Sequence, residues 1–162
     1  MKAPDLVGGN ADRQARMNQA HADGYSLCVD VLANLSNDAH YREWVGTFTA
    51  QRLQTVRDTF AGIRDRMEFT TFTYILTGVG CQSGLHAYTF KSETRIWTCE
   101  PFWSSPATGM ESKAGTVLHE HSHATAGTDD IRYGEGTCRQ LAIDDPNRAV
   151  RNAANYAYFA ES

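Results

Sequence analysis

The chain has 162 residues, of which 41% are hydrophobic and 21% charged, and its formal net charge is -4. A length of this order favours one domain with its own core, so we treat residues 1–162 as a single unit with a loose lead-in over residues 1–10. The plentiful apolar residues exclude intrinsic disorder, and the acidic balance without a Lys/Arg block argues against nucleic acid as a partner.

Two long helices are expected in the first part of the chain. Apolar residues recur at helical spacing over residues 11–35, and the Ser-Asn-Asp run at 36–38 supplies a stop signal and the next N-cap. A second helix is expected over residues 39–67, because one apolar stripe faces a surface of Arg and Asp side chains.

A small sheet and three further helices are expected to follow. Residues 69–76, 86–90 and 94–99 are rich in β-branched and aromatic residues and predict strands, the last two as a hairpin. Helices are expected from about residue 111, over residues 133–143, and after the Asp145-Pro146 helix start. The pattern therefore predicts an α+β fold, mostly helical, with a small antiparallel sheet.

The third expected helix, from about residue 111, carries a motif with metal-ligand spacing, H-E-x-x-H. His119 and His123 are four residues apart, so on a helix both project from one face and can reach a single metal ion. Glu120 can place its carboxylate beside a water molecule that the metal activates. His121 points to the opposite side of the helix and is not expected to be a ligand. The alternative is a surface helix with scattered histidines.

A catalytic zinc site takes three protein ligands and keeps an open position. A third histidine at the usual distance after the pentad is absent from this sequence. Glu135 comes early for a glutamate ligand on a following helix, and Glu161 is almost terminal. The segment that follows the pentad is instead G-T-D-D-I-R-Y-G, at residues 127–134.

These two elements together resemble the aspzincins, the M35 family of deuterolysin and the peptidyl-Lys metalloendopeptidases. The family signature is H-E-x-x-H followed closely by G-T-x-D-x-x-Y-G. All five fixed positions of the second element are filled here, by Gly127, Thr128, Asp130, Tyr133 and Gly134. The resemblance implies a zincin-like fold and extends over the last half of the chain, with the two N-terminal helices similar in outline.

The resemblance implies a role for each site residue. His119, His123 and Asp130 would bind one Zn²⁺, Glu120 would act as general base, and Tyr133 would stabilise the oxyanion. Each role agrees with the chemistry of the side chain, since a carboxylate oxygen completes an N/N/O ligand set and a phenol can donate to a developing oxyanion.

Two alternatives remain within this assignment. Asp129 lies at the distance where some other zincins place their third ligand, but only Asp130 uses the whole motif. Tyr133 could instead be a core tyrosine at a helix start.

The resemblance also implies a substrate pocket, and here the sequence differs. Peptidyl-Lys members carry an acidic residue in an Asn-Ala-Asp-Asn stretch of the last helix, which receives the substrate lysine. The matching stretch here places Ala154 at that position, and Ala157 occupies a neighbouring acidic one. Selectivity for lysine is therefore not carried over.

The four cysteines lack the C-x-x-C spacing of a zinc ribbon or redox motif. The resemblance implies a disulfide between Cys81 and Cys99. Cys28 and Cys138 could form a second bridge between the front of the chain and the catalytic half, or remain two buried thiols.

The sequence therefore predicts a zinc metalloendopeptidase that hydrolyses peptide bonds in proteins. A catalytically silent, metal-stabilised peptide-binding module and the peptidase domain of a delivered toxin are the alternatives. The expected partner is a protein or peptide substrate, with a pro-segment or an inhibitor or immunity protein as restraint, and the expected state is a monomer. No segment has the ~20 apolar residues of a membrane span, and residues 1–14 lack the apolar stretch of a secretory signal. We expect a mature or excised domain that is extracellular or exported.

Overall fold

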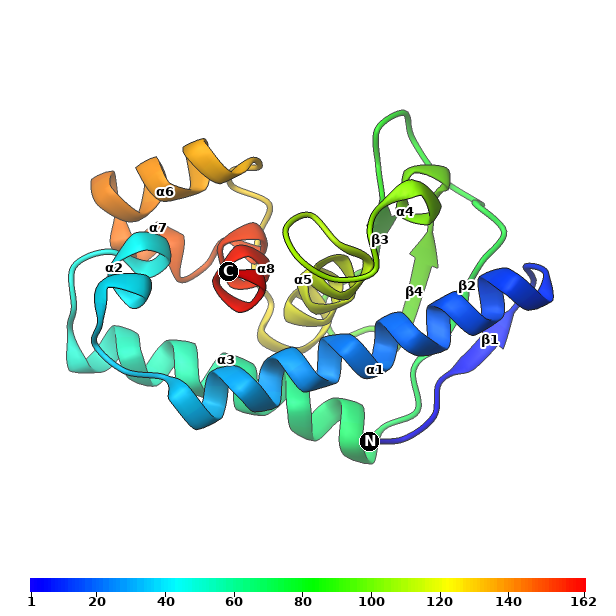
Figure 1. Cartoon of the computed structure of the whole chain (residues 1–162), viewed down its shortest axis with the longest axis horizontal. Coiled ribbons are helices and arrows are strands. Elements are labelled where there is room, and N and C mark those ends of the chain that lie inside the picture. Colours follow the sequence, from blue (N-terminus) through cyan, green and yellow to red (C-terminus); the bar gives the residue numbers. More distant parts are fainter.

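The computed structural model describes all residues, 1–162. Its elements, in chain order, are β1 (Asp5–Val7), α1 (Ala11–Asn34), α2 (Ala39–Val45), α3 (Ala50–Phe69), β2 (Thr73–Ile75), β3 (Ala87–Tyr88), β4 (Arg95–Thr98), α4 (Glu100–Ser104), α5 (Lys113–Ala126), α6 (Glu135–Asp144), α7 (Pro146–Ala149) and α8 (Ala153–Glu161). The long helices α1 and α3 run side by side along one edge of the molecule, with α5 and α8 packed against them (Figure 1). The sheet lies at the end where α1 begins, and α2, α6 and α7 lie at the other end. No helix is long and apolar enough to cross a membrane.

The sheet is mixed, so the expectation of an antiparallel sheet is only partly right. Its strand order is β1-β2-β4-β3. The pairs β1–β2 and β2–β4 are parallel, and only the hairpin pair β3–β4 is antiparallel. Parallel neighbours need a long crossover connection, and the three helices α1–α3 between β1 and β2 provide one.

The expected loose lead-in over residues 1–10 is wrong, because it contains a strand. Leu6 pairs with Tyr74, and the three residues of β1 lie in register with β2. Three residues carry too short a pattern to predict a strand alone. They are ordered by the sheet edge that β2 offers.

The expected single helix over residues 39–67 is in fact two helices, α2 and α3. Gly46 ends α2 with a φ of +89°, a conformation that side chains rarely adopt. A Cβ atom at this position would lie 2.0 Å from the carbonyl oxygen of Ala142 in α6. Thr49 then caps α3, accepting a hydrogen bond from the Arg52 N–H at 3.1 Å. The break lets α2 turn away and contact α6.

The helix expected after Asp145-Pro146 is also divided in two. Pro146 begins the single turn α7, and the Asp145 side chain accepts from the Arg148 N–H. A corner at residues 150–152 separates α7 from α8. The backbone of this corner pairs with Asp129, next to the predicted ligand Asp130.

Cys81 and Cys99 form a disulfide with a Cα–Cα distance of 5.7 Å. Cys28 and Cys138 are free and buried, so the second bridge is not formed. Burial raises the pKa of Cys28 to about 12 and that of Cys138 to about 11, so both are neutral thiols packed as small apolar groups.

His121 faces the core, on the side of α5 opposite to His119 and His123. Its Nε2 atom lies 2.8 Å from the hydroxyl of Tyr74 on β2, which in turn lies 2.7 Å from Nδ1 of His21 on α1. His21 Nε2 contacts the Lys2 carbonyl oxygen at 3.2 Å. This buried chain fixes α5 to the sheet and to α1, and His121 points to the opposite side of the helix from His119 and His123, as expected.

This network predicts acid sensitivity of the fold. Burial lowers the pKa of His21 to about 4, although the Lys2 carbonyl opposes the shift. In the unfolded chain the pKa of a histidine is ~6.5, so the unfolded state binds the proton more tightly and stability is lost as pH falls from about 6.5 to about 4. We expect the free energy of unfolding of His21→Gln to change less with pH, and the difference is at most about 3.5 kcal/mol at ~1.4 kcal/mol per pKa unit. Urea unfolding of both proteins at several pH values measures the difference, and parallel profiles would contradict the assignment.

Candidate metal centre

Helix α5 places the two predicted histidine ligands on one face, one turn apart. Ser112 caps its first turn by accepting from the Gly115 N–H at 3.0 Å. Gly127 ends the helix in the left-handed conformation, with φ +67° and ψ +31°, and its N–H donates to the His123 carbonyl. This glycine turn reverses the chain, so that the following segment returns toward the histidines.

Three donor atoms converge on this side of α5. Oδ1 of Asp130 lies 3.0 Å from Nε2 of His119 and 3.2 Å from Nε2 of His123, and the two nitrogens are 3.1 Å apart. A tetrahedral zinc ion with bonds of ~2.0–2.1 Å requires ligand atoms roughly 3.3 Å apart. The donor set of two imidazoles and one carboxylate therefore fits zinc in both geometry and chemistry.

Glu120 lies beside this cluster and is almost completely buried, with 4% of its surface exposed. Its Oε2 atom has no hydrogen-bond partner in the protein. Burial raises the pKa of the Glu120 carboxyl, while the neighbouring His119 and His123 act in the opposite direction. A buried carboxyl oxygen without a protein partner is suited to binding a water molecule in the site.

The electrostatics of the cluster favour an ionised Asp130 and a neutral Tyr133. Burial alone would raise the pKa of Asp130, but hydrogen bonds from His119 and His123 hold it well below its usual range. Burial and the neighbouring Asp130 carboxylate raise the pKa of Tyr133, so the phenol keeps its proton. Tyr133 is 59% exposed, and its ring stacks on the ring of His119 with the ring centroids 6.1 Å apart. Its position is therefore the solvent side of the site and not the core.

A second layer of hydrogen bonds orients the ligands. Nδ1 of His123 lies 2.8 Å from the Thr128 carbonyl oxygen, to which it donates when Nε2 is free to bind a metal. The Ser122 hydroxyl donates to the His119 carbonyl at 2.7 Å and pairs with the Thr128 hydroxyl at 2.7 Å. Thr128 was visible as a fixed motif position, but the role of Ser122 was missed, because the spacing of the pentad says nothing of its intervening residues.

Asp129, the rival third ligand, points elsewhere. Its carboxylate accepts from the Lys91 ammonium at 2.6 Å and from the Arg151 guanidinium at 2.8 Å. These hydrogen bonds lower the pKa of Asp129. The three residues whose donor atoms lie within 4.8 Å of one another are His119, His123 and Asp130.

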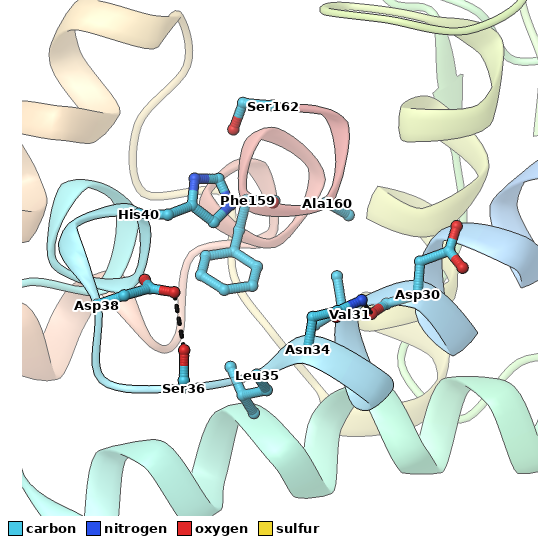
Figure 2. Close-up of a pocket in the computed structure, with 10 residues that line it drawn as sticks. All are labelled: Asp30, Val31, Asn34, Leu35, Ser36, Asp38, His40, Phe159, Ala160 and Ser162. Carbon is cyan, nitrogen blue, oxygen red and sulfur yellow. Dashed lines mark hydrogen bonds between the residues drawn. The ribbon is translucent and has the colours of Figure 1, made fainter.

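A separate hollow lies between the end of α1, the start of α2 and the end of α8 (Figure 2). In it the His40 ring lies next to Phe159, and the Ser36 hydroxyl donates to Asp38 at 2.8 Å. Phe159 lies in the C-terminal part of α8. The carbonyl of Asp129, next to the ligand Asp130, accepts a hydrogen bond from Ala153, the first residue of α8. The hollow is therefore at the opposite end of α8 from the metal-ligand cluster.

Helix-borne histidines, an aspartate on the returning loop and a buried adjacent glutamate define the type of site that metal-dependent peptidases use. Comparison with known proteins narrows this class. The model of the M35 aspzincin family, described as lysine-specific metallo-endopeptidase, matches residues 31–161. The chain therefore belongs to the aspzincin family of zinc metallo-endopeptidases.

Individual relatives are similar to this chain over nearly all of its length. An extracellular protease of Aeromonas hydrophila is 38% identical over 98% of this chain and 49% of its own length. A peptidyl-Lys metalloendopeptidase of Pleurotus ostreatus is 35% identical over 97% of this chain and 96% of its own. The solved zinc peptidase of Grifola frondosa superposes with a TM-score of 0.87 at 29% identity, covering 94% of this chain and 96% of that one. The chain spans about half the length of the Aeromonas protein and nearly all of the Pleurotus protein.

Proposed function

We propose that the chain is a zinc-dependent endopeptidase in which His119, His123 and Asp130 bind one Zn²⁺. The observation that carries this proposal is the convergence of their three donor atoms beside the buried Glu120, in a member of a zinc endopeptidase family. A bound zinc ion supplies Lewis acidity, which polarises the scissile carbonyl and makes water a better nucleophile near neutral pH.

Glu120 is the proposed general base. Its Oε2 atom, which has no hydrogen-bond partner in the protein, can accept a proton from the attacking water. The same carboxyl group, now protonated, can deliver that proton to the amine that leaves. Burial supports this second step, since a raised pKa lets the carboxyl hold the proton between the two transfers.

Tyr133 is the proposed oxyanion donor. Its phenol is neutral and lies at the solvent side of the site, where the carbonyl group of a bound peptide would lie. A hydrogen bond from this hydroxyl is strongest when negative charge develops on the carbonyl oxygen, so it favours the transition state over the bound substrate.

The substrate is a protein or peptide, and we propose that the bond cut is not restricted to one that precedes lysine. The two positions that matter are Ala154 and Ala157, on the face of α8 that also carries Glu161. Both alanines are buried. An unpaired ammonium group buried beside these alanines would cost several kcal/mol, so the alanines favour small or apolar substrate side chains.

Mass spectrometry of fragments from an unfolded protein of mixed sequence tests this specificity. We expect new N-termini of several residue types, and we expect the double variant Ala154→Asp/Ala157→Glu to increase the share that begins with lysine. If almost all fragments of the unaltered enzyme begin with lysine, the prediction is wrong. Glu111, whose carboxylate accepts from the Tyr158 hydroxyl on α8 at 3.1 Å, would then be the acid to replace by glutamine.

We propose that the enzyme acts outside the cell that makes it. The Cys81–Cys99 disulfide is typical of oxidising compartments, and the Aeromonas relative is an extracellular protease.

The proposed activity is tested with the purified protein. We expect about one zinc ion per chain by elemental analysis, and cleavage of an unfolded protein that stops with a chelator and returns with added zinc. A protein that binds zinc and peptides but never cleaves would be a binding module, and the proposed activity would be wrong.

A further inference from the structure

The segment that carries both Asp130 and Tyr133 has no regular secondary structure between the end of α5 and the start of α6. Apart from one isolated β-bridge between Asp129 and Asn152, the backbone N–H and C=O groups of residues 129–133 therefore have no partners within a helix or a ladder of strands. Such groups need other partners when they are buried, and these partners decide the path of the chain. In this segment the path sets how the Asp130 carboxylate and the Tyr133 phenol face the two histidines.

One side chain supplies three of the partners of this segment. Oδ1 of Asn152 accepts from the N–H groups of Ile131 at 2.8 Å and Arg132 at 3.1 Å, and Nδ2 donates to the Arg132 carbonyl at 3.0 Å. Asn152 is completely buried. A single amide thus binds both residues that separate Asp130 from Tyr133.

The amide is itself held in one orientation. Nδ2 of Asn152 also donates to Oδ1 of Asn155 at 2.7 Å, and Asn155 donates to the carbonyl groups of Trp44 and Cys138. These contacts fix which end of the Asn152 amide is the oxygen. The Oδ1 atom of Asn152 therefore faces the N–H groups of Ile131 and Arg132, which need an acceptor.

The backbone on either side of Asn152 binds the same segment. The Asp129 N–H donates to the Arg151 carbonyl at 2.7 Å, and the Ala153 N–H donates to the Asp129 carbonyl at 3.0 Å. Residues 151–153 thus bind the chain before Asp130 through backbone groups, and they bind the chain after Asp130 through the Asn152 side chain. Asp130 lies between these two attachments.

We propose that Asn152 is a positioning residue that sets the third zinc ligand and the oxyanion donor together, an inference that rests on the proposed roles of Asp130 and Tyr133. It touches neither the donor atoms nor the substrate, and acts through the backbone of residues 131–132. Groups that orient metal ligands typically change metal affinity or activity about 10- to 100-fold when removed. Loss of Asn152 should therefore weaken zinc binding and lower kcat, with little change in KM.

The matched control is Asn155, a buried asparagine in the first turn of α8. Its amide accepts from Asn152, but it donates to the backbone of α2 and α6 and makes no contact with residues 131–132. Asn152→Ala and Asn155→Ala each remove one buried amide, so both should lower the thermal stability of the chelator-treated protein. Zinc affinity, measured by competition with a chromophoric chelator, should fall about 10- to 100-fold in Asn152→Ala. It should fall less than about 3-fold in Asn155→Ala, because the Asn152 amide loses one contact there but keeps its three hydrogen bonds to residues 131–132.

The outcomes separate this inference from the proposed function. If the unaltered protein does not bind zinc, the proposed function fails. If it binds zinc and both alanine variants keep that affinity and kcat, or lose them equally, Asn152 has only a structural role and this inference is wrong. If Asn152→Ala does not fold, Asn152→Gln and Asn155→Gln retain an amide but displace it by one methylene. The same two measurements then apply, and equal zinc affinities in this pair would again overturn the inference.

Discussion

Replacing Glu120 by glutamine is expected to abolish turnover while zinc binding stays nearly unchanged. The glutamine has the same shape and can occupy the same buried position, but its amide cannot accept and return a proton. A positioned general base contributes ~10²- to 10⁴-fold, so we expect kcat to fall by at least about 100-fold. Zinc content should stay near that of the unaltered protein, because Glu120 is not among the three convergent donors.

The measurement combines elemental analysis with cleavage of an unfolded protein by Glu120→Gln and the unaltered enzyme, prepared in parallel. Activity within about 10-fold of the unaltered enzyme would mean that another group accepts the proton, since ~10²-fold is the lower end of a general base's contribution. Loss of zinc together with activity would mean that Glu120 supports metal binding, which this account does not predict.

The second large effect is expected at the two consecutive aspartates. Asp130→Ala removes one of three donor atoms and should weaken zinc binding by more than the ~100-fold that loss of an orienting group can cost. Asp129→Ala is the matched control, because it removes a neighbouring carboxylate that contacts Lys91 and Arg151. Those ion pairs are exposed to solvent, so their loss should change stability little.

Competition with a chromophoric chelator gives both zinc affinities. We expect the Asp129→Ala value within a few-fold of the unaltered protein. A large loss in Asp129→Ala with normal affinity in Asp130→Ala would reverse the ligand assignment.

The sequence predicted that the two histidine side chains would lie together, because their geometry is local. The four-residue spacing of His119 and His123 sets their common face once the segment is helical. Asp130 could be assigned as a ligand only through the family signature, because the left-handed turn at Gly127 brings its carboxylate back to the two histidines. Periodicity reports which face is buried, but not how an irregular loop is directed.

The features that were missed depend on distant parts of the chain. Strand β1 forms because it pairs with the edge of β2, a strand some 68 residues later in the sequence; Asp5 pairs with Thr73. The break at Gly46 is required by the close approach of Ala142. Asn152 lies 20 residues from Arg132, and nothing at its own position in the sequence indicates that contact. In each case the partner is known only from the three-dimensional structure.

The central claim is that one zinc ion binds to His119, His123 and Asp130. Anomalous diffraction at the zinc absorption edge from crystals of the zinc-loaded protein tests it most directly. We predict one strong peak, ~2.0–2.2 Å from Nε2 of each histidine and from a carboxylate oxygen of Asp130, as in known zinc sites. A peak bound to Asp129 instead of Asp130, or located away from the two histidines, would contradict the account.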